Sequence, residues 1–305
     1  MGISVTIFQQ IFIMFLLMSI GYFFYKKQLI SNQGSKDMGK ILLYLVLPIV
    51  IIRSFMIPNN PENRELLLIS TLVTILSLGI SMALSRFFFG KTCGISNFSS
   101  SFSNVGFLGI PLVASVIGEK AVFYISMIVV LVTTLQWTYG VFVMTKDKSM
   151  IQLKTILFNP MVVSAFIGLV LFFTQFPIPG TVLKTSNYIA DLNTPLAMMV
   201  SGIYLAQTDL KAMVQNKKTY WVSFVRLMII PVITILIFWL IPFGTVELKL
   251  AILIASACPV GSGVAIFANQ YEQDYIMAVE QVCLSTILCM LSLPLTISFA
   301  NLLIH

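Results

Sequence analysis

Two stretches of the chain decide its fold: residues 99–111 read SSSFSNVGFLGIP, and residues 255–265 read ASACPVGSGVA. Each stretch lies within a long apolar segment, yet each carries glycine and proline near its middle. Because proline removes a helix hydrogen bond and clashes with the preceding turn, both segments are predicted to be interrupted helices. The freed backbone groups would need another helix, water or a ligand as partner inside a membrane. One such segment alone would more simply be a kinked helix, but a matched pair favours a binding site.

The composition around these stretches is that of an integral membrane protein. Of the 305 residues, 58% are apolar and only 10% are Asp, Glu, Lys or Arg, against about 25% charged residues in soluble proteins. The net charge of +7 comes from short basic clusters between apolar runs, which is typical of membrane orientation. We therefore expect contact with membrane lipid and no nucleic-acid partner. The four cysteines and His305 lack metal-site spacing, so no metal and no cofactor are expected.

Ten apolar segments are predicted to be transmembrane helices, because each is about long enough to span a bilayer. Their long apolar runs lack the alternation of barrel strands, so the fold class is an all-α bundle. The segments cover residues 3–25, 38–57, 65–89, 95–117, 120–145, 156–176, 186–207, 219–241, 247–268 and 275–303.

The loops predict the orientation of these ten spans. The loops after odd-numbered spans carry twelve Lys and Arg residues, and the loops after even-numbered spans carry four. Since basic loops stay in the cytoplasm, both termini are expected on the extracytoplasmic side of the cell membrane.

An internal repeat is visible in the glycine and proline positions. A spacing of 147 or 148 residues relates three pairs in corresponding spans: Gly21 and Gly168, Pro48 and Pro195, and Pro111 and Pro259. We expect two five-helix units, residues 1–150 and 151–305, with helices four and nine broken. An odd number of spans per unit gives the units opposite orientations, and such 5+5 inverted repeats are typical of transporters.

Candidate binding residues lie at the two breaks. Asn104 offers a donor and an acceptor for a carboxylate or amide ligand, although an interhelical hydrogen bond is the alternative. Arg226 lies within the eighth span, where it could be the counter-charge of an anionic substrate or could reach the interface by snorkelling. Ser103 and Asn159 are secondary candidates. The remaining candidates are Gly109, Pro111, Pro259, Gly261, Ser262 and Gly263.

Other polar residues are candidates for coupling or anchoring. Glu280 lies about five residues into the tenth span, where a desolvated carboxylate could exchange protons; an interfacial position facing water is the alternative. Arg53 is expected to be a snorkelling anchor, and Asp191 and Asn193 to be capping or interfacial residues.

Five segments resemble the auxin efflux carrier family, which joins plant auxin carriers to bacterial carriers of organic acids. They are Asn104-x4-Gly109-x-Pro111, Ala257-x-Pro259-x-Gly261, Arg226-x4-Pro231, Asn159-Pro160, and the closing stretch from Ser285 to Pro294. The long hydrophilic loop of the plant carriers is absent, since residues 146–155 form a short connection. Val264 and Met161 also depart from the plant pattern, so a bacterial-type member is the better match.

The resemblance implies a scaffold of residues 1–57 and 156–207 and a moving transport domain of residues 65–145 and 219–303. It also implies a homodimer and a substrate site at the two breaks. We therefore predict a secondary active transporter, not an enzyme, for a small organic anion. The candidates are mono- or dicarboxylates such as malate- or malonate-like acids, or an auxin-like acid. The mechanism would be elevator-type alternating access, coupled to protons. A sodium-coupled carrier of the bile-acid type is the alternative, and an ion channel is less favoured.

Overall fold

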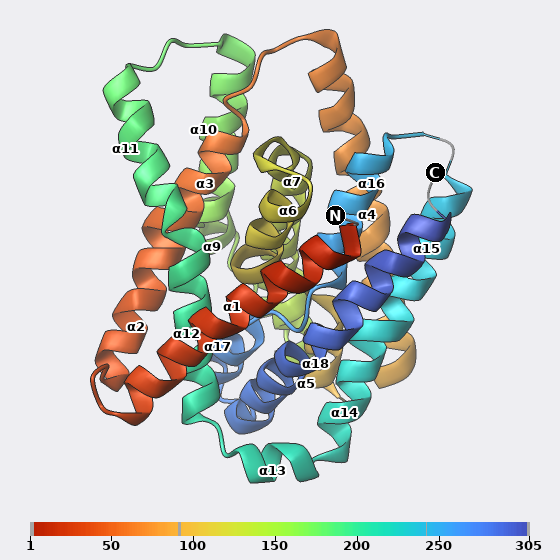
Figure 1. The fold of residues 1–305 in the computed structure, drawn as a ribbon. Coiled ribbons are helices and arrows are strands. Elements are labelled where there is room, and N and C mark those ends of the chain that lie inside the picture. Colours follow the sequence, from red (N-terminus) through yellow and green to blue (C-terminus); the bar gives the residue numbers. More distant parts are fainter. Residues whose placement is uncertain (1–2, 91–92, 242, 304–305) are drawn as a thin grey trace.

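The computed structural model describes residues 3–90, 93–241 and 243–303, and within these ranges every regular element is a helix (Figure 1). Six helices of the described ranges are long and apolar enough to cross a membrane. They cover Phe8–Lys26, Pro61–Phe89, Glu119–Thr145, Gly180–Gln207, Lys217–Leu240 and Tyr275–Leu303. Shorter apolar helices cover Val105–Val116 and Pro160–Thr174. The chain is therefore an all-α, multi-pass membrane protein, as the composition predicts.

The first half of the chain contains the elements up to residue 150. They are α1 (Ile3–Lys26), α2 (Asn32–Ile41), η1 (Leu42–Val46), α3 (Leu47–Ser54), α4 (Pro61–Phe89), α5 (Gly94–Ser101), η2 (Val105–Gly109), α6 (Ile110–Val116), η3 (Glu119–Ala121), α7 (Val122–Leu135), η4 (Gln136–Gly140), α8 (Val141–Thr145) and η5 (Lys148–Met150).

The second half also contains both continuous and divided helices. It contains α9 (Leu153–Leu157), α10 (Pro160–Thr174), α11 (Gly180–Asp191), α12 (Asn193–Gln207), α13 (Leu210–Gln215), α14 (Lys217–Phe224), η6 (Val225–Ile229), α15 (Ile230–Leu240), α16 (Val246–Ala257), α17 (Gly263–Gln270) and α18 (Tyr275–Leu303).

Some helices begin earlier than their apolar segments. The helix predicted from residue 38 begins at Asn32, because the side chain of Ser31 accepts a hydrogen bond from Gly34 N–H and caps a polar first turn. The helix predicted from residue 186 begins at Gly180, after Pro179. Polar first turns carry no hydropathy signal, so the apolar pattern locates these helices but not their ends.

Prolines inside the bundle are accommodated by wide π-helical turns. The turns that start at Leu42, Val105 and Val225 each precede a proline by six residues, namely Pro48, Pro111 and Pro231. Proline lacks an N–H and its ring collides with the carbonyl four residues earlier, so a local change of helix register relieves the conflict. These three prolines therefore bend helices without ending them.

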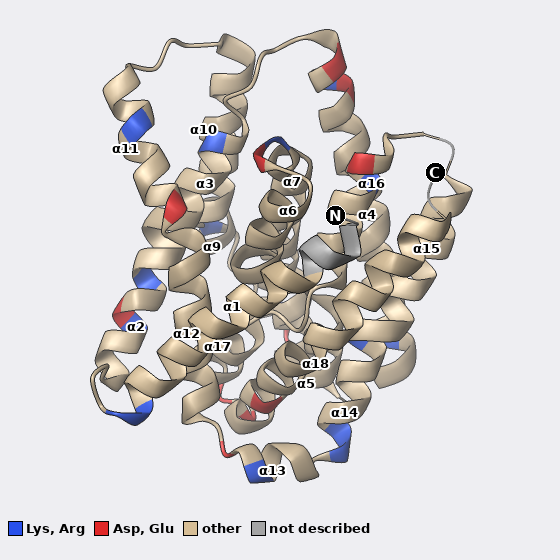
Figure 2. Ribbon diagram, viewed as in Figure 1, with Lys and Arg blue, Asp and Glu red and all other residues tan. Residues whose placement is uncertain are grey.

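Two helix pairs form close contacts. α1 packs along α12, where Gly21 faces the backbone of Met199 and Gly202 faces the backbone of Met18, so that a Cβ at either glycine would overlap its neighbour. α3 packs along α10, where Gly168 lies against the ring of Phe55. Small residues permit such close approach between membrane helices. In Figure 2 many charged residues lie toward the two ends of the bundle, with those of α13 and α14 at one end.

Candidate functional site

Two helices are interrupted in the middle of the bundle. α5 ends at Ser101, and helix resumes with η2 at Val105; α16 ends at Ala257, and helix resumes with α17 at Gly263. In Figure 1, α5 and α17 lie in the lower half of the view and α6 and α16 in the upper half. The two interrupted segments therefore run in opposite directions through the bundle.

The two interruptions cross each other and are joined by backbone hydrogen bonds. Asn104 N–H donates to the Pro259 carbonyl (2.8 Å), and Gly261 N–H donates to the Phe102 carbonyl (3.0 Å). Ser103 and Val260 form an isolated antiparallel bridge at this point. Each break thus satisfies part of the other's backbone, which a low-dielectric interior requires.

The first break differs from the position that proline suggests. The backbone leaves helical geometry at Phe102–Asn104, whereas Pro111 lies in a continuous helix behind the η2 turn. The wide η2 turn changes the hydrogen-bond register ahead of Pro111 and so accommodates its missing N–H. The helix therefore does not break there. Pro259, in contrast, lies within the second break.

Glycines allow the two breaks to approach closely. A Cβ on Gly261 would lie 3.0 Å from the Ser103 carbonyl oxygen, and a Cβ on Gly109 would lie 3.5 Å from both Ala255 Cα and Cys258 Sγ. Gly109 is therefore at the contact between η2 and α16 and not at a ligand surface. Ser285 Oγ, from α18, accepts a hydrogen bond from Val260 N–H at 3.1 Å.

Arg226 holds the crossing together from η6. Its side chain is 1% exposed. Nη1 donates to Ser81 Oγ (2.9 Å) and to the Ser100 carbonyl (3.0 Å), while Nε donates to the Cys258 carbonyl (3.1 Å) and Nη2 to the Ser256 carbonyl. The guanidinium thus binds carbonyls at the carboxyl ends of both α5 and α16, where helix dipoles favour positive charge. Four of its five N–H donors are thus bound to the protein.

A cavity of about 200 Å³ opens beside the crossing, and we call it the neutral cavity because every described residue that lines it is uncharged. Its polar side chains come from both breaks and from neighbouring helices: Ser103, Asn104, Thr133, Gln136, Asn159 and Ser262. Its aromatic walls are Tyr44, Phe107, Trp137 and Phe267. The first turns of η2 and α17 also line it, so the positive ends of two helix dipoles lie at this space.

Gln136 is a cavity residue that the sequence analysis missed. It lies in the π-helical turn η4, and a Cβ on Gly263 would be 3.0 Å from its Oε1. A single glutamine within the apolar run 120–145 is the signal that could have indicated it. Asn159 lines the same cavity but also has a structural role. Its Oδ1 accepts a hydrogen bond from Met161 N–H (2.9 Å) and caps α10.

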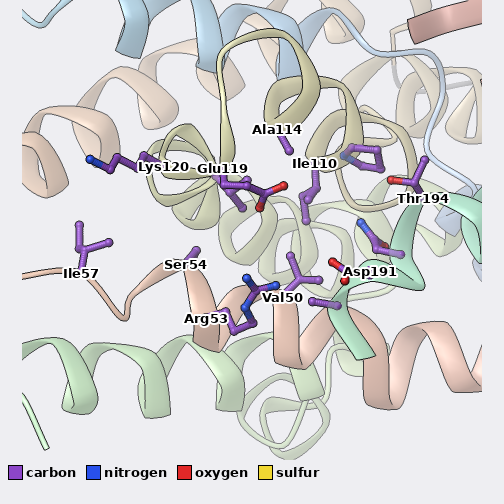
Figure 3. A pocket seen from close by; sticks show the side chains of 14 residues that line it. Val50, Arg53, Ser54, Ile57, Ile110, Ala114, Glu119, Lys120, Asp191 and Thr194 are labelled. Carbon is purple, nitrogen blue, oxygen red and sulfur yellow. The ribbon is translucent and has the colours of Figure 1, made fainter. Parts of the chain in front are cut away.

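A second cavity, of about 300 Å³, lies between α3, α6, η3 and the junction of α11 with α12, and we call it the charged cavity. Its lining includes Arg53, Glu119, Lys120 and Asp191, together with Pro111. In Figure 3, Arg53, Glu119 and Asp191 point toward the space between them, whereas Lys120 points away from it. Within the described ranges the one ion pair joins Lys40 to Asp37, so these four side chains are not paired with one another.

Glu280 lies apart from both cavities. It is 5% exposed, and its Oε2 accepts a hydrogen bond from Asn216 Nδ2 at 2.7 Å. Together with Lys217 and Lys218 it borders a separate hollow at the junction of α14 and α18. Its neighbourhood is therefore the end of the bundle that carries the basic loop after α12.

The candidates of the sequence analysis fall into three groups. Arg226, Gly109 and Pro259 build the crossing, while Pro111 and Glu280 lie at other places. Six candidates line the neutral cavity: Ser103, Asn104, Asn159, Gly261, Ser262 and Gly263.

Comparisons with known proteins identify similarity to membrane transport proteins along almost the whole chain. Residues 6–297 match the profile of a family described as membrane transport protein. An uncharacterized transporter of Methanocaldococcus jannaschii is 25% identical over 305 aligned positions, covering 93% of this chain and 96% of the relative. One of Methanothermobacter thermautotrophicus is 25% identical, with 92% and 93% covered. The uncharacterized transporter YfdV of Escherichia coli K12 is 20% identical, with 82% and 84% covered.

Proposed function

Since the chain belongs to the membrane transport protein family, the auxin efflux carrier family, we propose that it is a secondary active carrier of a small organic acid, bound as its carboxylate at the crossing of two broken helices. The family match confirms the resemblance found in the sequence and implies transport rather than catalysis. The observation that carries the proposal is the neutral cavity, where both breaks meet and six predicted site residues line one space.

The chemistry of this cavity suits a carboxylate. The first turns of η2 and α17 line it, and the positive end of a helix dipole favours an anion. Asn104 and Gln136 add side-chain donors. Arg226 acts on the substrate only through the crossing that it stabilises, because its donors bind Ser81 and backbone carbonyls.

The proposed transport mechanism is elevator-type alternating access. In this proposal the scaffold is residues 1–57 and 156–207, and the transport domain is residues 65–145 and 219–303. Each cavity is lined by residues from both of these sets. Movement of one body along the other would enlarge one cavity and close the other. The reciprocal pairing of α1 with α12 and of α10 with α3 supports an inverted five-helix repeat. A homodimer in the cell membrane, with both termini extracytoplasmic, completes the proposal.

Proton coupling is proposed through Glu280, which is buried and whose Oε2 accepts a hydrogen bond from Asn216. Sodium coupling is the second candidate, and a specific observation favours it. Ser99 Oγ, Ser223 Oγ and Gln281 Oε1 are buried without a hydrogen-bond partner, and they belong to α5, α14 and α18, which pack against one another. Unpaired buried oxygens need an explanation, and a bound cation is one.

The test is flux in proteoliposomes that contain the purified chain. Labelled mono- and dicarboxylates are supplied under an imposed pH gradient, with sodium present or replaced by choline. We expect saturable uptake that falls by about tenfold or more in Asn104→Ala, the effect of losing about 1.4 kcal/mol of binding. Asn301→Ala, near the end of α18, is the matched control and should transport normally. Equal flux in wild type and Asn104→Ala would exclude the neutral cavity as the binding site. Unsaturable flux with single-channel currents would indicate a channel.

A further inference from the structure

The charged cavity holds an arrangement of side chains that the carboxylate proposal leaves unused. Arg53 is half-buried on α3, Glu119 lies in η3, and Asp191 ends α11. Their charged groups point into one space of about 300 Å³ and form no ion pair with each other. That volume is at the lower end of small-molecule sites, which measure about 300–1,000 Å³.

We propose that the charged cavity is a second binding site for the cargo, and that the cargo is an amino acid or a close analogue, carrying an ammonium group beside its carboxylate. This inference rests on the proposed function and narrows its substrate class. The carboxylate pairs with Arg53, and the ammonium group lies between Glu119 and Asp191.

Charge complementarity favours an amino acid over a molecule that carries only a carboxylate or only an amine. A carboxylate alone could pair with Arg53 but would face Glu119 and Asp191, and like charges at close range repel. An amine alone could pair with the two carboxylates but would face the guanidinium. A molecule with both groups satisfies all three side chains. The apolar remainder of the lining, which includes Val50, receives its carbon skeleton.

The cavity has members on both sides of the predicted domain boundary. Arg53 and Asp191 belong to the scaffold, and Glu119 belongs to the transport domain. A ligand bound to all three would bridge the two bodies, and it would leave Arg53 and Asp191 when the transport domain moves. The site is therefore a loading site and not a place where the cargo is carried.

The neutral cavity suits the same cargo. A carboxylate entering it would be bound by helix dipoles and amide donors but would meet no charged side chain, because every described lining residue is uncharged. An added ammonium group cancels one negative charge. The carbonyl oxygens of Asn104 and Gln136 can accept its hydrogen bonds, and the faces of Trp137 and Tyr44 attract cations.

Matched pairs of probes test the inference. Purified full-length protein is assayed by thermal shift, and proteoliposomes by uptake, with alanine against propionate and glutamate against glutarate; ethylamine is the amine-only probe. We expect the amino member of a pair to stabilise the protein and to be taken up with a KM at least about tenfold lower than that of its partner. Glu119→Gln and Asp191→Asn should each raise that KM by about tenfold and leave the KM of the deaminated acid unchanged or lower.

Two further variants complete the design. Arg53→Gln should raise the KM of both members of a pair, because each carries a carboxylate. Lys184→Gln removes a positive charge from α11 outside the cavity and should change neither KM. All four variants should unfold at the wild-type temperature, because the altered side chains form no hydrogen bond or ion pair in the described structure.

The outcomes separate this inference from the proposed function. One outcome would overturn the charged-cavity site but leave the carboxylate carrier intact. In it, deaminated acids are transported as well as amino acids, and Glu119→Gln and Asp191→Asn do not change the ratio of their KM values. Ethylamine bound as tightly as alanine would overturn it in favour of a cation site. Failure of every carboxylate, with or without an amino group, would overturn both.

Discussion

The two halves of the chain bring different chemistry to one crossing. The buried charged side chains of the described residues, Arg226, Lys249 and Glu280, all belong to the second half, whereas the buried polar side chains of the first half are hydroxyls and amides. The repeat spacing of 147 residues places Gly79 at the position of Arg226. Each half thus contributes one break, but one guanidinium serves both, since Arg226 reaches carbonyls of both breaks.

The largest expected effect of breaking this asymmetry is that of Arg226→Leu. The substitution removes the guanidinium donor from the carbonyls of Ser256 and Cys258 and leaves the Ser100 carbonyl with Ser81 Oγ as donor. Each buried polar group without a partner costs about 1–3 kcal/mol. We expect a loss of at least about 3 kcal/mol of unfolding free energy, measured by chemical denaturation of the purified protein in detergent. Flux should be lost as well.

Two controls sharpen this comparison of the halves. Arg226→Lys keeps the charge with fewer and differently placed donors, so its stability should be intermediate. Gly79→Ala changes the corresponding position of the first half, where a Cβ meets no atom within 4 Å, and should be neutral or slightly stabilising. Wild-type stability in Arg226→Leu would show that the guanidinium does not hold the breaks together.

The next effect concerns the contact between the breaks. Gly261→Ala places a Cβ 3.0 Å from the Ser103 carbonyl oxygen, and the neighbours are backbone atoms that cannot rotate away. We expect a loss of about 1–3 kcal/mol, as for overpacked cores. Gly106→Ala is the matched control on the other break, because its Cβ meets only the flexible side chain of Leu47, at 3.3 Å. Equal losses in both variants would mean that the crossing is not tighter at Gly261.

The sequence predicts the class of fold and the existence of both breaks, but not the place of the first one. Glycine and proline mark positions where a helix is weakened, and the η2 turn resolves that weakness at Pro111 without breaking the helix. The break at Phe102–Asn104 depends on the partner segment, since Pro259 and Gly261 supply its hydrogen bonds. Such a long-range partner leaves no local pattern in the sequence.

The candidate site is predicted in part for the same reason. The sequence indicates Asn104, Ser262 and Gly263 as candidates because they lie at the breaks, and all three line the neutral cavity. Gln136 was missed because its helix carries no interruption in its sequence pattern. The role of Arg226 at the crossing was not predicted either, because its hydrogen-bond partners are backbone carbonyls, which every residue possesses.

A smaller effect is expected from Glu280→Gln, which tests whether a residue of the second half alone couples transport to protons. Glu280→Gln removes the ionisable group but keeps an oxygen that can accept the hydrogen bond from Asn216. For one coupled proton, a gradient of one pH unit can drive accumulation up to about tenfold, and this factor should fall to about one in the variant. Exchange of substrate without a gradient should continue. Asp274→Asn, at the same hollow, is the control, and a variant that still responds to the gradient would exclude Glu280 as the coupling group.

The smallest effect is expected at Pro111, which is related to Pro259 by the repeat spacing but lies outside a break. Pro111→Ala restores an N–H in a helix whose wide turn already accommodates the proline, so stability should change by less than about 1 kcal/mol. Flux should stay within about twofold of wild type, measured beside Asn104→Ala in the same proteoliposomes. A loss as large as that of Asn104→Ala would place the working interruption of the first half at its proline. The two halves would then function alike, although their backbones differ.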